Sequence, residues 1–146
     1  MVSLSLDWLG DLRFVNTDDS PAIELNSSTP GVTSPPQALA YGVMACMGMD
    51  VVHTIQKGRH DLRAMRVRFE GERAVEHPRR FVTMGLHFEI TGTVPDHVVQ
   101  RAIDLSREKY CSVWNTVRSD VQLKTSFDIR PPSGGAKGSH QVKGSH

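Results

Sequence analysis

Short segments near the N-terminus alternate apolar and polar residues with the period of a half-buried strand. The apolar positions of the first segment are Val2, Leu4, Leu6 and Trp8. A period of two places these side chains on one face of an extended chain. Residues 9–11 then supply a turn into a second strand around 12–14, and a third strand is expected at 22–25. Residues 26–36 are rich in Ser, Thr, Pro and Gly and are expected to form a loop.

Longer alternating segments later in the chain predict the main sheet. Apolar residues occupy every second position in 65–69 and again in 82–90, with charged or polar residues between them. The connection between these segments contains Pro78 and predicts a hairpin. A last strand is expected at 123–129.

Three segments have helical signals. Residues 37–57 follow a Pro-Pro pair, contain no proline and end at Gly58, which predicts the longest helix. Its residues 38–49 carry no charge, too short a run to span a bilayer but enough to make every side of the helix apolar. A second helix is expected from Pro95, and a short third one over 112–117.

Together these elements predict one domain, residues 1–130, followed by a flexible C-terminal tail, residues 131–146. The tail has the composition of a segment with nothing to bury. The remaining elements are too few to cover the apolar helix all round. We therefore expect a homodimer in which two central helices pack together.

Charge and N-terminal pattern exclude some classes of partner. Lys plus Arg number 17 and Asp plus Glu 16, so the net charge of +1 gives no reason to expect a nucleic acid or a membrane partner. The basic residues of 57–68 are followed by the acidic residues Glu70 and Glu72, and this charged segment is interpreted as a solvated sheet face. The first residues do not resemble a secretory signal, and we expect a cytoplasmic protein.

Chemistry is expected at the two cysteines. Cys46 lies in the middle of the apolar helix, with Asp50 and His53 on the same face. His53 is about 10 Å further along the axis and is too far to act as its base. The spacing matches no zinc motif, so no metal site is expected, and Asp50 and His53 are interpreted as the solvated end of the helix.

Cys111 is expected just before a short helix, where unpaired amide donors favour a thiolate. Burial would instead raise the pKa of Cys46, so that thiol requires a nearby cation. Arg13 is the candidate for this cation, although a solvated strand arginine is an equal interpretation. Two unrelated buried thiols remain possible. Motifs for nucleotide, phosphate or flavin cofactors are absent, and no cofactor is expected.

Both cysteine segments resemble those of the OsmC/Ohr family. The helix segment reads PPQALAYGVMACMGMDVV, residues 35–52, and the second segment reads RAIDLSREKYCSVWNTV, residues 101–117. The order of elements also resembles that family. The resemblance implies an α+β, OsmC-like two-layer fold, with a long central helix packed on an antiparallel sheet, in an intertwined homodimer.

The resemblance further implies a thiol peroxidase that reduces organic hydroperoxides. Cys46 would be the peroxidatic thiol and Cys111 the resolving one, with a dithiol reductant, lipoyl-type in the best-known members, restoring both. Gln37, Tyr41 and Met49 on the same helix are expected to bind the substrate.

One departure from the family keeps a second function open. The positions that match the family's helix-start glutamate hold Pro36 and Gln37. The alternative is a non-enzymatic protein that binds an apolar ligand in the dimer cleft or acts as a thiol redox sensor. A third interpretation makes both thiols core residues only.

Overall fold

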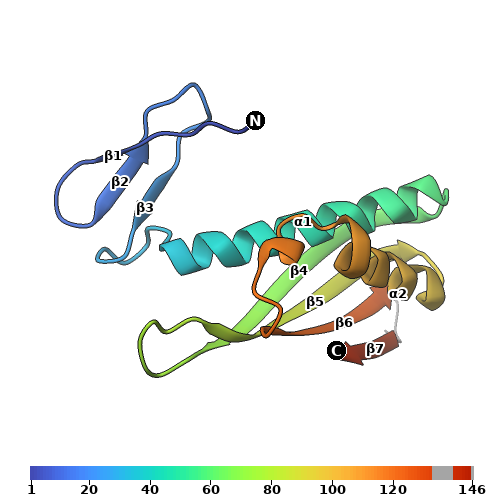
Figure 1. The fold of residues 1–146 in the computed structure, drawn as a ribbon. Coiled ribbons are helices and arrows are strands. Elements are labelled where there is room, and N and C mark those ends of the chain that lie inside the picture. The colour runs from blue at the N-terminus through green and yellow to red at the C-terminus, as the bar shows by residue number, and fades with distance from the viewer. Residues whose placement is uncertain (133–139, 146) are drawn as a thin grey trace. The chain divides into compact units, whose positions relative to one another are not determined.

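The structure, a computed structural model, describes residues 1–132 and 140–145 (Figure 1). It divides into two compact units, residues 1–42 and 43–146, and each unit is described by itself. The long helix α1, Pro35–Lys57, begins in the first unit and continues into the second.

The first unit contains a three-stranded antiparallel sheet in the order β1-β2-β3. Its strands are β1 (Leu6–Trp8), β2 (Arg13–Asn16) and β3 (Glu24–Asn26). The predicted N-terminal hairpin and third strand are therefore present. The first strand is shorter than the alternation in 2–8 predicts, because strand pairing on β2 starts only at Leu6.

Helix α1 begins with a side-chain cap. Ser34 precedes the first helical residue, and its backbone N–H donates to Gln37 Oε1 at 2.9 Å, while the Gln37 N–H donates to Ser34 Oγ at 3.4 Å. This reciprocal pair is a capping box, which satisfies amide groups that have no partner inside the helix.

Within the second unit, one face of α1 is buried in the core. The buried positions recur every fourth residue and are Val43, Met47, Val51 and Ile55. Gly48 faces β4, where an added Cβ would make an ordinary van der Waals contact of 3.4 Å with Val67 Cγ2. The helix ends at Lys57, directly before Gly58, as predicted.

The second unit contains a four-stranded sheet in the order β4-β5-β6-β7 among the described residues. The strands β4 (Asp61–Arg73) and β5 (Phe81–Thr93) form the predicted hairpin. Strand β6 (Gln122–Arg130) then pairs with β5 in parallel. A parallel neighbour requires a crossover connection, and helix α2 (Asp96–Leu105) lies within it.

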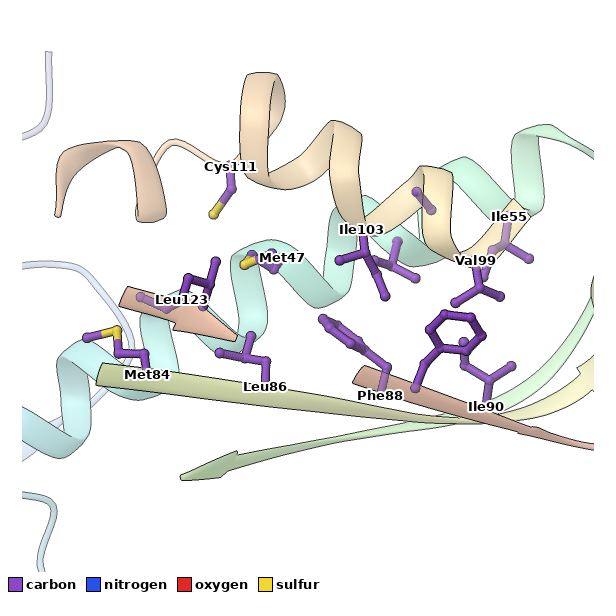
Figure 2. Close-up of a cluster of buried hydrophobic side chains, with 14 of the residues drawn as sticks. Met47, Ile55, Met84, Leu86, Phe88, Ile90, Val99, Ile103, Cys111 and Leu123 are labelled. Carbon is purple, nitrogen blue, oxygen red and sulfur yellow. The ribbon is translucent and has the colours of Figure 1, made fainter. Parts of the chain in front are cut away.

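The core lies between this sheet and the helices. In Figure 2, Met84, Leu86, Phe88 and Ile90 of β5 point toward Met47 and Ile55 of α1 and Val99 and Ile103 of α2. Helices on one face of a sheet make the predicted two-layer α+β fold, but the sheet is mixed and not wholly antiparallel, because the crossover through α2 makes β6 parallel to β5. Two short helical turns, η1 (Ser106–Tyr110) and η2 (Trp114–Thr116), complete the crossover.

Part of the predicted C-terminal tail differs from the prediction. Residues 140–145 form strand β7 (His140–Ser145), which pairs antiparallel with β6. The physical reason is the open edge of β6, whose unpaired N–H and C=O groups can accept another strand. Residues 131 and 132 are outside any strand, and residues 133–139 and 146 lie outside the described residues.

Helix α1 is the only helix in the described part of the chain whose length and apolar composition would allow a membrane span. Core helices of soluble proteins pass the same test. The face of α1 that carries Met47 and Val51 is buried against the sheet, as in such a core helix.

Candidate functional site

The two cysteines, 65 positions apart in sequence, come together inside the second unit. Their sulfur atoms and a carboxylate oxygen of Asp50 all lie within 4.8 Å of one another. Both thiols are free. Cys46 comes from α1 and is half-buried, whereas Cys111 follows η1 and is fully buried. In Figure 2 the Cys111 sulfur points toward α1.

A π-helical turn places Cys111 at this position. The N–H of Cys111 donates to the carbonyl of Ser106 at 2.8 Å, a bond that spans five residues and closes η1. Cys111 itself leaves the helix in an extended conformation. Turns of this kind are rare, and many occur at functional sites.

The segment after Cys111 is held by one amide side chain. Asn115 Nδ2 donates to the carbonyl of Cys111 at 2.8 Å and to that of Arg107 at 3.1 Å. These bonds satisfy carbonyls at the end of η1 and fix the direction in which residues 112–114 leave it. The predicted short helix over 112–117 is observed as the single turn η2.

Residues 112 and 113 direct hydrogen-bond donors at Cys46. Burial by itself would raise the pKa of the Cys46 thiol, but the backbone N–H of Val113, the thiol of Cys111 and the hydroxyl and N–H of Ser112 together lower it below its ordinary value. Ser112 Oγ lies 3.9 Å from Cys46 Sγ. The Cys46 thiolate is therefore stabilised by neutral donors from the Cys111 segment.

The pKa of Cys111 is displaced in the opposite direction. Burial raises the pKa of its thiol to about 11, and the neighbouring Cys46 and Asp50 also raise it. The N–H of Trp114, which donates to Cys111 Sγ at 3.2 Å, opposes this shift only in part. At neutral pH the geometry thus pairs a thiolate-prone Cys46 with a protonated Cys111.

Asp50 is part of this cluster, which corrects its interpretation as a solvated helix end. Its Oδ2 accepts a hydrogen bond from Ser106 Oγ at 2.8 Å, and Ser106 is completely buried. His53, one turn further on, is exposed, as expected for the solvated side of the helix. The pattern of α1 alone could not separate these two residues, because Ser106 comes from another element.

The other predicted site residues are placed as follows. Arg13 belongs to the first unit, where it forms an ion pair with Glu24 at 2.9 Å, so its assignment as the cation beside Cys46 stays a prediction. Gln37 acts in the helix cap. Tyr41 and Met49 have exposed side chains, and their assignment to substrate binding also stays a prediction.

Sequence reasoning missed Ser106, Ser112 and Val113 as site residues. It placed amide donors near Cys111, and such donors are present, but two of them act on Cys46. The extended conformation of Cys111 turns the following amides toward α1, and only the three-dimensional path of the chain shows this.

Comparison with known proteins agrees with the fold and with the family resemblance. Residues 28–126 match the family model described as OsmC-like protein. Protein YhfA of Escherichia coli K12 is 35% identical over 125 residues, which cover 84% of this chain and 93% of YhfA.

Solved structures give the same result for the fold. A hypothetical protein from Aquifex aeolicus VF5 has a TM-score of 0.82 at 24% identity, covering 90% of this chain and 97% of that one. A Legionella pneumophila protein described as an organic hydroperoxide resistance protein OsmC has a TM-score of 0.67 at 20% identity, covering 87% and 97%. With the family match extending over more than half of its residues, this chain belongs to the OsmC-like protein family.

Proposed function

We propose that this chain reduces organic hydroperoxides by a two-cysteine mechanism, with Cys46 as the attacking thiol and Cys111 as the resolving thiol. The observation that carries the proposal is the pairing of two close sulfurs whose pKa values are displaced in opposite directions. A low pKa suits the attacking thiol, Cys46. Protonation keeps the resolving thiol, Cys111, unreactive until the sulfenic acid has formed.

In the first step the Cys46 thiolate attacks one oxygen of the O–O bond. An S–O bond forms, the O–O bond breaks, and the alkoxide leaves as an alcohol after it takes a proton. Cys46 becomes a sulfenic acid and the peroxide is reduced by two electrons. Cys46 is half-buried, as a thiol that must meet a substrate should be, whereas Cys111 is fully buried.

In the second step the Cys111 sulfur attacks the Cys46 sulfur. The S–O bond breaks, hydroxide combines with the proton of the Cys111 thiol and leaves as water, and a disulfide forms. The sulfurs must close from their present separation, under 4.8 Å, to a bond length of about 2.05 Å. We propose that the Asp50 carboxylate, hydrogen-bonded by Ser106, accepts the Cys111 proton on its way to the leaving hydroxide.

A dithiol then resets the enzyme by two exchange reactions, so no bound cofactor is required. We place the chain in the cytoplasm, where reductants of this class keep thiols reduced.

We also propose a homodimer, since Ala45 and Met49 leave apolar surface of α1 exposed in the single chain. The name of the Legionella protein, which refers to organic hydroperoxide resistance, supports the same substrate class.

The experiment is steady-state turnover of cumene hydroperoxide with dihydrolipoamide. We expect Cys46→Ser to fall to the uncatalysed rate. Cys111→Ser should keep its first turnover and lose most of the later ones, because the sulfenic acid on Cys46 then has no thiol in the same chain to react with. Ser119→Ala, an exposed residue after η2, is the matched control and should equal the wild type. Turnover by Cys46→Ser at the wild-type rate would contradict the assignment.

A thiol redox sensor is the second candidate. It is favoured by the N-terminus of α1, where Gln37 stands in place of the family glutamate and is used in the helix cap. A sensor would form the same disulfide once per molecule but would show no sustained turnover with the dithiol, which separates it from the peroxidase in the same assay.

A further inference from the structure

A second polar cluster lies on the face of the main sheet opposite the helices. Leu86, Phe88 and Ile90 of β5 point into the core, so the residues between them point the other way. In the parallel register His87 is opposite Ser126 of β6, and Glu89 is opposite Asp128. Four polar side chains therefore meet at the β5–β6 seam.

The imidazole of His87 is fixed by both neighbours on β6. Its Nδ1 lies 2.6 Å from Ser126 Oγ, and its Nε2 lies 3.3 Å from Asp128 Oδ2. Ligand atoms of His87, Glu89 and Asp128 all lie within 4.8 Å of one another. The arrangement brings one imidazole nitrogen and two carboxylates close enough together to bind the same ion.

Asp128 is the independent observation. The residue is only 4% exposed, and its Oδ1 has no hydrogen-bond partner in the part of the chain that the structure describes. A buried carboxylate oxygen without a partner is destabilising, because its hydration is lost and nothing replaces it. A cation that binds both carboxylate oxygens of Asp128 would supply the missing partner of Oδ1.

We propose that His87, Glu89 and Asp128 bind one divalent metal ion of the Zn²⁺ class. Two ligands with metal bonds of about 2.0–2.1 Å on a tetrahedral ion lie about 3.3 Å apart. The His87 Nε2 to Asp128 Oδ2 separation matches that value. Imidazole combined with carboxylates favours Zn²⁺ over the all-oxygen sites of Mg²⁺ and Ca²⁺.

Ser126 has a second role in this site. With Nε2 on the metal, the Nδ1–H of His87 donates to Ser126 Oγ, which fixes the ring and its tautomer. Glu89 is also in an ion pair with Arg68 at 3.2 Å. The Arg68 side chain is 64% exposed, and an exposed pair of this kind contributes little, so Glu89 is free to turn to the metal.

The ion would join β5 to β6 on the face that the core does not stabilise. The site is separate from the two thiols and does not depend on the proposed peroxidase activity. The sequence does not predict this site, because His87 and Asp128 are 41 positions apart. The parallel register alone brings them together.

The test uses the full chain with Cys46→Ser and Cys111→Ser, so that the thiol cluster cannot bind metal. Zn²⁺ is titrated into the metal-free protein by calorimetry, and Co²⁺ is added as an absorption probe of coordination. We expect one equivalent to bind and the thermal midpoint to rise with Zn²⁺ concentration.

Four variants of this chain assign the ligands. His87→Gln and Asp128→Asn should abolish the tight equivalent, and Ser126→Ala should weaken it at least about tenfold, as loss of a group that orients a ligand does. His97→Gln, an exposed histidine of α2, is the control and should bind as the parent does. Circular dichroism verifies that each variant is folded, and Ser126→Ala, the mildest change, keeps the test valid if a ligand variant unfolds.

Absence of Zn²⁺ binding by the parent at tens of micromolar would overturn the proposal. Equal affinity in His87→Gln and the parent would overturn it as well, since the metal would then be held elsewhere.

Discussion

At the scale of single residues, the site is defined by how two identical side chains acquire different chemistry. Cys46 is reached by the N–H groups of Ser112 and Val113, which favour its thiolate. Cys111 is enclosed by the core, which favours its thiol. Neutral backbone donors fill the role for which the sequence pattern required a cation. A contribution from Arg13 would add to these donors and is not needed to explain the direction of the shift.

Replacement of Ser112 by Ala tests the donor set at Cys46. Loss of the hydroxyl 3.9 Å from the sulfur removes one of the groups that lower the Cys46 pKa, so that pKa should rise. The measurement is the pH dependence of Cys46 alkylation by iodoacetamide, with labelled peptides identified by mass spectrometry. Ser119→Ala should leave the curve unchanged, and an unchanged curve in Ser112→Ala would show that the hydroxyl does not act on the thiol.

The high pKa of Cys111 predicts a pH dependence of stability. The folded state holds the Cys111 proton more tightly than the unfolded state does, because the folded pKa of about 11 exceeds the ordinary value of 9.0. The stabilisation that the folded state gains from holding this proton is fully present below about pH 9 and is lost as the pH rises through about 11. Between these values the free energy of unfolding should fall more steeply in the wild type than in Cys111→Ser.

Urea unfolding at a series of pH values measures both slopes. Apart from Cys46, whose pKa the Cys111 thiol helps to lower, the groups that titrate in this range are common to the two proteins and cancel in the difference, as does any constant loss of stability from the substitution. Parallel curves for the two proteins would contradict an elevated Cys111 pKa.

At the scale of elements, the site depends on an irregular connection. The π-helical turn η1 ends α2, and the single turn η2 follows after three residues. A regular helix across 106–115 would keep its amides inside its own hydrogen-bond ladder. The break at Cys111 releases the amides of 112 and 113 for Cys46, and Asn115 fixes the break by binding two carbonyls.

Asn115→Ala tests the role of this connection. Two hydrogen bonds, each worth about 1 kcal/mol net, would be lost, so we expect a destabilisation of about 1–2 kcal/mol. Because the amides of 112 and 113 would lose their fixed direction, Cys46 alkylation at neutral pH should also slow. Denaturant unfolding and alkylation rates report the two effects, with Ser119→Ala as the control. A loss of stability with no change in alkylation would mean that Asn115 supports the fold but not the donors.

At the scale of the whole molecule, the fold was predictable because its main elements have strong local patterns. The alternation in 82–90 and the proline-to-glycine limits of 37–57 both identified elements that the structure contains. Features that depend on residues distant in sequence were not predicted. The extension of β4 to Asp61, the π-helical turn and the pairing of β7 with β6 depend on neighbours distant in sequence.

The candidate site was likewise predictable only in part from the sequence. Cys46 and Cys111 were identified because cysteines are rare in the chain and their segments resemble those of a known family. Ser106 and Ser112 carry no distinguishing local signal, since serine is common in surface turns. Their roles follow from contacts of 2.8 Å to Asp50 and 3.9 Å to Cys46, which only the folded chain brings about.

The proposed homodimer predicts an effect of charge on α1. Met49 is 69% exposed in the single chain, and Met49→Lys should weaken self-association if α1 packs against its counterpart. Sedimentation velocity over a range of protein concentrations measures this. Val75→Lys, at an apolar residue that is 89% exposed in the β4–β5 connection, is the matched control and should stay dimeric. Equal association in the two variants would place the interface elsewhere.

The central claim is that Cys46 and Cys111 act on each other after peroxide reduction. The most direct measurement adds one equivalent of cumene hydroperoxide to the reduced protein without a dithiol, followed by rapid alkylation and peptide mapping. We predict one intramolecular Cys46–Cys111 disulfide and one equivalent of alcohol. Recovery of both cysteines as alkylated thiols, with the hydroperoxide unconsumed, would contradict the account.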